Sequence, residues 1–129
     1  MTTPLADADQ PRYLDFVTSV AGWEGVWGLY HNGWILHTTG EGQKFCPLFA
    51  TREAARSWGA SIRTDHIPSA ITLVELIEHL MAQWRLHDIE PGICPTPSQG
   101  PVLPGHDRLH ADLLSALKTA MQERFAPKR

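Results

Sequence analysis

The chain has 129 residues, a length typical of one domain and sufficient for one hydrophobic core. Apolar residues make up 43% and charged residues 19%, which excludes a disordered polymer and a membrane protein. Eleven Lys and Arg against fourteen Asp and Glu give a net charge of −3, which argues against a nucleic-acid binder, since such proteins neutralise phosphates. We therefore predict a single domain over residues 1–129.

The first residues and the cysteines indicate the compartment. The N-terminus lacks a basic segment followed by an apolar one, so no secretory signal is expected. The two cysteines, Cys46 and Cys94, are too few for a disulfide framework, and we expect thiols, although a single bridge stays open. These features predict a cytoplasmic protein.

A helix and a hairpin are expected in the first third of the chain. Tyr13 and the apolar residues after it recur on one helical face, which predicts a helix over 11–21. Two aromatic and β-branched runs flank Asn32-Gly33, which predicts a β-hairpin over 26–39 with a two-residue turn.

The register of that hairpin follows from the turn length. A two-residue turn pairs His31 with Trp34, and it places four apolar side chains on one face of the ribbon. We expect this face to be the core face: Trp27, Leu29, Trp34 and Leu36.

The next segments predict a strand, a short helix and a connection. Residues 43–49 have strand composition, and Pro47 favours an edge strand or a strand end. Thr51 is suited to cap a helix over 51–58 that Gly59 closes. Residues 60–71 are expected to form a connection in which Ile67-Pro68 is extended, because a proline restricts the residue before it.

The clearest helix lies in the second half. Thr72-x-x-Glu75 is a capping box before an apolar periodic run, and it predicts a helix over 72–87. Its buried face would comprise Leu73, Leu76, Ile77, Leu80, Met81 and Trp84.

A Pro/Gly-rich arm over residues 91–106 is expected to lead to a last helix over 107–125, which Asp107 caps. A short strand near 92–95 would precede the extended part of the arm. The order of elements predicts an α+β fold with a small antiparallel sheet.

Metal and nucleophile chemistry find little support. His106 and His110 are spaced to share an ion, but neither Cys46 nor Cys94 belongs to a paired-cysteine motif that would complete a zinc site. The nucleophile elbow and the phosphate-binding glycine motifs are missing. We predict no catalytic residue, no metal and no cofactor.

Candidate partner-binding residues come from the aromatic and acidic segments. Trp23 follows a glycine expected to end a helix, which favours an exposed ring, and tryptophan is common in binding hot spots. Residues 67–104 carry four acids and one Arg, a net charge of −3, so Glu75, Glu78 and His79 form a candidate surface for a basic partner. A solvated helix face explains the same charges equally well.

Two further hypotheses remain open. His37 and Tyr30, with a nearby cysteine, would line a pocket of a small-ligand-binding protein or an enzyme. Alternatively, the helix over 107–125 would pack on a second chain in an obligate homodimer with a structural or adaptor role.

The segments Gly25-Val-Trp-Gly-Leu-Tyr-His-Asn-Gly-Trp34 and Pro47-Leu-Phe-Ala-Thr-Arg-Glu-Ala-Ala55 resemble a bacterial domain-of-unknown-function family, the 2750 type. The resemblance covers about residues 11–97, and the stretch from Ser98 departs from it. The family brings no assigned catalytic residues. Small bacterial proteins of this kind often act as immunity partners, so the resemblance implies a non-enzymatic immunity protein that binds and neutralises a cognate toxin.

Overall fold

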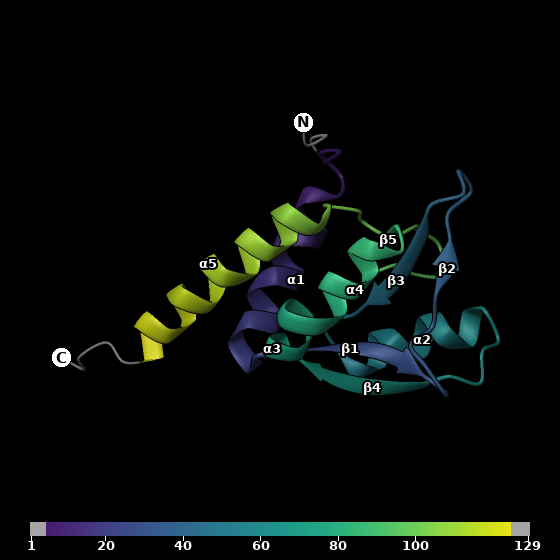
Figure 1. Cartoon of the computed structure of the whole chain (residues 1–129), viewed down its shortest axis with the longest axis horizontal. Coiled ribbons are helices and arrows are strands. Elements are labelled where there is room, and N and C mark those ends of the chain that lie inside the picture. Colours follow the sequence, from purple (N-terminus) through teal and green to yellow (C-terminus); the bar gives the residue numbers. More distant parts are fainter. Residues whose placement is uncertain (1–4, 125–129) are drawn as a thin grey trace.

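The computed structural model describes residues 5–124 (Figure 1). Its helices and strands confirm the predicted α+β class. The helices are α1 (Gln10–Trp23), α2 (Arg52–Ser61), the consecutive segments α3 (Leu73–Glu75), η1 (Leu76–Leu80) and α4 (Met81–Leu86), and α5 (His106–Arg124). The strands are β1 (Gly25–Tyr30), β2 (His37–Thr38), β3 (Lys44–Leu48), β4 (Ile67–Thr72) and β5 (Ile89–Ile93).

The strands form two small sheets that meet at one point. β1 pairs antiparallel with β4, whereas β3 lies between β2, its antiparallel neighbour, and β5, its parallel neighbour. Trp27 of β1 and Phe49, just after β3, exchange two backbone hydrogen bonds of 2.9 and 2.8 Å. The sheets are therefore linked, and the expectation of a purely antiparallel sheet was wrong because β5 runs parallel to β3.

The predicted hairpin over 26–39 forms only at its turn. Asn32 and Gly33 have the positive φ angles expected there, 57° and 147°. However, Tyr30 rather than His31 pairs with Trp34, so the loop has one residue more than predicted. A one-residue shift exchanges the two faces of a strand, which explains why Ile35 is buried and the predicted core residue Leu36 is exposed. Past residue 35 the chain leaves β1, and β2 pairs with β3 instead.

The long partner of β1 lies in the segment that was predicted to be a connection: its start at Ile67-Pro68 is extended as expected, but its pairing as a strand was not predicted. β4 pairs along the whole of β1, from Gly25 opposite Thr72 to Tyr30 opposite Ile67. Its Pro68 cannot donate to a sheet ladder, but within residues 5–124 β4 has one neighbouring strand and therefore tolerates a proline.

The strand predicted over 43–49 is confirmed, but it is central in its sheet and not an edge strand. Backbone N–H groups alternate sides along a strand, so position 47 faces the same side as Phe45 and Phe49. Phe45 pairs with β2 and Phe49 with β1, and Pro47 falls between these two partners. The missing donor of Pro47 therefore costs no ladder hydrogen bond.

The short strand predicted near 92–95 is β5, which lies a few residues earlier. Gly92 in β5 is opposite Pro47, and a Cβ atom added there would overlap the Phe45 ring. A glycine is thus required where the aromatic ring crosses the neighbouring strand.

The helix predicted over 72–87 is confirmed as the consecutive segments α3, η1 and α4. The Thr72 hydroxyl accepts a hydrogen bond of 3.1 Å from the Glu75 N–H, as the cap motif predicted. Leu73, Leu76, Met81 and Trp84 are buried along its inner face. The middle segment has π-helical hydrogen bonding, a feature that the sequence did not predict.

The other predicted helices are confirmed with changed ends. α1 extends to Trp23, and Glu24 with a positive φ of 61° ends it in place of Gly22. Thr51 caps α2 as predicted, but Gly59 lies inside the helix, where an added Cβ would be 3.3 Å from Leu29. α5 begins at His106, and the predicted last residue of the helix, 125, lies outside the described residues.

α5 packs against α1, and the two helices run in the same general direction (Figure 1). The Tyr13 hydroxyl donates a hydrogen bond of 2.6 Å to Asp112, and Leu109 and Leu113 are fully buried. Beyond Leu113 the helix is less covered, since Leu114 and Met121 are about half exposed, at 51% and 50%. The first half of α5 is thus part of this chain's own core.

The buried apolar residues form two clusters. The larger one extends from Tyr13 to Leu113 in sequence, and the smaller one surrounds Leu29, Phe49 and Trp58. Among residues 5–124, no helix is both long and apolar enough to cross a bilayer.

Candidate functional site

The predicted exposure of Trp23 is confirmed. It is the last residue of α1, and 44% of its surface is exposed. Its ring lies over Gly25, where an added Cβ would be 2.5 Å from the indole, and its centroid is 5.9 Å from that of Trp27. The two contacts pack one part of a large aromatic ring against β1 and leave the rest at the surface.

The end of α1 and the start of α3 are neighbours. The Glu24 carbonyl accepts a hydrogen bond of 3.1 Å from the Leu73 N–H, and Gly25 is opposite Thr72 in the β1–β4 pair. This connection places the end of α1, where Trp23 lies, next to the start of the helix that carries Glu75.

Glu75, Glu78 and His79 are all exposed on this helix. Glu75 Oε2 lies 4.0 Å from His79 Nε2, one helical turn away. Val74 beside them is 64% exposed, so an apolar side chain lies among the acids. Glu78 and His79 belong to the π-helical segment, a distortion that is frequent at functional sites.

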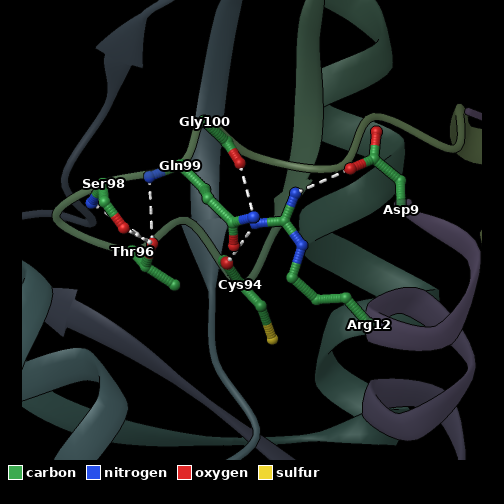
Figure 2. A network of polar contacts seen from close by, with 7 residues as sticks. All are labelled: Asp9, Arg12, Cys94, Thr96, Ser98, Gln99 and Gly100. Atoms are coloured by element: carbon green, nitrogen blue, oxygen red, sulfur yellow. Dashed lines mark hydrogen bonds and ion pairs between the residues drawn. The ribbon is translucent and has the colours of Figure 1, made fainter.

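The Pro/Gly-rich arm is held against α1 by Arg12, a residue that no sequence pattern singled out (Figure 2). The Arg12 guanidinium donates to the carbonyls of Cys94 and Gly100 at 3.0 and 2.9 Å, and it pairs with Asp9 at 2.9 Å. Cys94 has a positive φ of 47°, which turns its carbonyl out of the strand direction. The only sequence signal was a basic residue in the first turns of a helix, and it did not indicate a partner so distant in the chain.

The arm itself is ordered by short-range hydrogen bonds. Ile93 and Val102 pair across it with backbone bonds of 2.8 and 2.9 Å. The Thr96 hydroxyl accepts hydrogen bonds from the N–H groups of Ser98 and Gln99 at its tip (Figure 2). These hydrogen bonds give the Pro/Gly-rich arm a narrow, hairpin-like shape.

The cysteines are free thiols, as expected. Burial raises the pKa of the Cys46 thiol far above its usual value. Burial also raises the pKa of Cys94, although a backbone hydrogen bond involving Ala50 and the charge of Arg12 act in the opposite direction. Protonated, buried thiols are poor nucleophiles.

The pocket that the ligand-binding hypothesis places around His37 exists, but other residues line it. A pocket of about 250 Å³ is lined by His37, Phe45 and Trp58 together with Pro95 and other residues of the arm. His37 stacks on Phe45 with ring centroids 5.9 Å apart. Neither Tyr30 nor a cysteine is among the residues that line it, so the group named by the ligand-binding or enzyme hypothesis is not assembled there.

His106 and His110 do not share a site. His106 is 9% exposed, and its Nε2 donates to the Ile89 carbonyl at 2.8 Å, whereas His110 is exposed. Glu90 Oε2 lies 3.8 Å from His106 Nε2. Within residues 5–124, no group of three His, Cys, Asp or Glu residues is arranged to hold a metal ion.

The comparisons with known proteins identify a family but no function. No curated protein and no solved structure matches the sequence significantly. A family model described as "Protein of unknown function (DUF2750)" matches residues 13–113. The match extends past residue 97 through the arm and into α5, so the predicted departure from the family at Ser98 was placed too early. Because the match covers most of the sequence, the chain belongs to the DUF2750 family, as its tryptophan and glycine motifs had indicated.

Proposed function

We propose that the protein is a non-enzymatic protein-binding module of the bacterial cytoplasm, an immunity protein that binds and neutralises a cognate toxin. The observation that carries this proposal is the packed, half-exposed ring of Trp23 at the end of α1, next to the start of the helix that carries Glu75. The partner we envisage presents an apolar pocket surrounded by Lys and Arg residues.

The packing of Trp23 supports a role in binding. A side chain that is already immobilised loses little conformational entropy when a partner covers it. Because the indole already packs on Gly25 and Trp27, burying its exposed part in a partner would cost less ordering entropy than burying an unpacked side chain.

The charges of Glu75 and Glu78 are available to a partner. Within the described part of the chain, no Lys or Arg nitrogen lies within 4.0 Å of either carboxylate. Exposed acids of this kind chiefly accelerate association with a basic surface, and they contribute less to the lifetime of the complex.

The test is co-expression with the product of each adjacent reading frame. We expect one of these products to inhibit growth alone and to be neutralised by the wild-type chain. Trp23→Ala and the double variant Glu75→Lys/Glu78→Lys should lose neutralisation. Matched controls alter other exposed residues, Leu86→Ala and Asp15→Lys.

Two results would contradict the proposal. Absence of any neutralised neighbour would remove the immunity role. Full neutralisation by Trp23→Ala would show that this surface is not where the partner binds.

The homodimer stays a second candidate because Leu114 and Met121 are half exposed on α5. Deleting residues 98–129 is not a clean test, since Val102, Leu109 and Leu113 belong to the core and their loss would unfold the chain. The double variant Leu114→Glu/Met121→Glu leaves the core intact. A homodimer through α5 predicts that this variant becomes monomeric in sedimentation, and a monomeric wild-type chain would refute it.

A further inference from the structure

A second surface feature lies on the segment from α2 to the start of β4. A groove of about 370 Å³ separates these elements. Arg52 and Arg56 of α2 line one side, and Thr64 and His66 line the loop that follows the helix. Leu29 forms its floor, where Gly59 leaves room because it has no side chain.

The two arginines of this groove carry charges that the fold does not neutralise. They are one helical turn apart, and among the described residues no carboxylate oxygen lies within 4.0 Å of either guanidinium. No Asp or Glu is among the residues that line the groove, whereas the chain as a whole has a net charge of −3. The groove therefore carries a local positive charge on an acidic protein.

His66 offers a third polar group. The backbone N–H of His66 donates to the Thr64 hydroxyl at 3.1 Å. The same hydroxyl lies 2.8 Å from the ring Nδ1 of His66. Asp65 lies 3.4 Å from Nδ1, so a negative charge flanks the ring, but Asp65 does not line the groove.

The opposite wall is apolar. Ile67 and Pro68 line it at the start of β4, and Ile67 is 64% exposed although it is a large aliphatic residue. A groove that combines two arginines with an exposed aliphatic side chain suits a ligand with an anionic head and an apolar body.

We infer that this groove binds a small organic phosphate monoester. The guanidiniums of Arg52 and Arg56 would hold the phosphate, because their planar N–H forks match its oxygens and their two charges match a dianion. The apolar body of the ligand would lie against Ile67 and Pro68. A carboxylate offers half the charge and would bind more weakly.

The test uses phenyl phosphate as the probe and the full chain labelled with ¹⁵N. Titration should shift the amide signals of Thr64 and its neighbours in a saturable manner. The double variant Arg52→Gln/Arg56→Gln should weaken binding about tenfold or more. The matched control Lys44→Gln/Lys118→Gln removes the same charge from exposed positions outside the groove and should leave the affinity within about twofold.

The other outcomes each decide a part of the inference. Benzoate and inorganic phosphate should both bind more weakly than phenyl phosphate. If benzoate bound as tightly as phenyl phosphate, the groove would not select a doubly charged head group. If inorganic phosphate bound as tightly as phenyl phosphate, the apolar body of the ligand would make no useful contact with Ile67 and Pro68. Absence of saturable shifts near Thr64, or equal weakening in both double variants, would overturn the site. None of these results depends on the toxin-binding proposal, which concerns another surface.

Discussion

Replacing Arg12 with Ala should destabilise the protein by loosening the arm from α1. The side chain makes two hydrogen bonds to carbonyls and one ion pair, and its partners at Cys94 and Gly100 are more than 80 residues away in the sequence. These contacts (Figure 2) are the principal polar connection between the arm and the N-terminal helix. Their loss therefore tests whether the arm belongs to the folded body.

The magnitude follows from the surroundings of each contact. The Cys94 carbonyl is partly buried, and a hydrogen bond to a charged donor in such a place contributes about 1.5 to 3 kcal/mol. The Gly100 carbonyl is exposed and can regain water, and the ion pair with Asp9 contributes about 0.5 kcal/mol. We expect Arg12→Ala to lower the free energy of unfolding by about 2 to 3 kcal/mol.

Urea denaturation followed by tryptophan fluorescence measures this loss. Arg12→Lys should recover only part of it, because an ammonium cannot replace a fork that donates in several directions. Amide exchange at Gln99, whose N–H is bonded to the Thr96 hydroxyl, should accelerate in Arg12→Ala. Lys118→Ala, an exposed position on α5, is the control. A loss below about 0.5 kcal/mol relative to that control would refute the reasoning.

Three further predictions concern the core. Gly92→Ala should lower the free energy of unfolding by about 2 kcal/mol or more in thermal denaturation, because its Cβ overlaps the Phe45 ring; unchanged stability would mean that the ring moves freely. Burial and, second, the hydrogen bond to the Asp112 carboxylate raise the pKa of Tyr13. The protonated phenol therefore stabilises the fold fully below about pH 10, and this stabilisation is lost as the pH rises further. In urea titrations at several pH values, Tyr13→Phe should show a smaller loss of stability at alkaline pH than the wild type. The buried Cys46 should react with a thiol reagent at pH 8 far more slowly in the native than in the denatured protein, and the partly buried Cys94 should be slowed less; rapid native labelling of Cys46 would contradict its burial.

The helices could be predicted from sequence because their determinants are local. Thr72 and Glu75 lie three residues apart, and the apolar residues of the helix that follows repeat at helical spacing. Thr51, three residues before Ala54, predicted the start of α2 in the same way, because its hydroxyl caps the helix. The end of α2 was misjudged because Gly59 is needed for its close contact with Leu29, a tertiary reason that no local pattern contains.

Strand pairing was predicted poorly because partners are distant in the sequence. β1 and β4 are more than 35 residues apart, and Pro68 obscured the strand character of β4. A single extra loop residue, at the Asn32-Gly33 turn, then exchanged the faces of the following segment.

The sequence predicted which residues of the candidate surface are exposed, but not that the helices carrying them lie next to each other. Trp23 and Glu75 were selected as exposed residues, and both are exposed. That α1 ends where α3 begins depends on the Glu24–Leu73 hydrogen bond and on the β1–β4 register, neither of which the sequence reveals.

Titration calorimetry of the purified chain with the purified product of the neutralised neighbouring frame tests the central claim most directly. The account predicts that Trp23→Ala weakens the affinity about thirtyfold, equivalent to about 2 kcal/mol, because the indole is the packed apolar anchor of the surface. Leu86→Ala should bind like the wild-type chain. Equal affinity of Trp23→Ala and wild type would contradict the account.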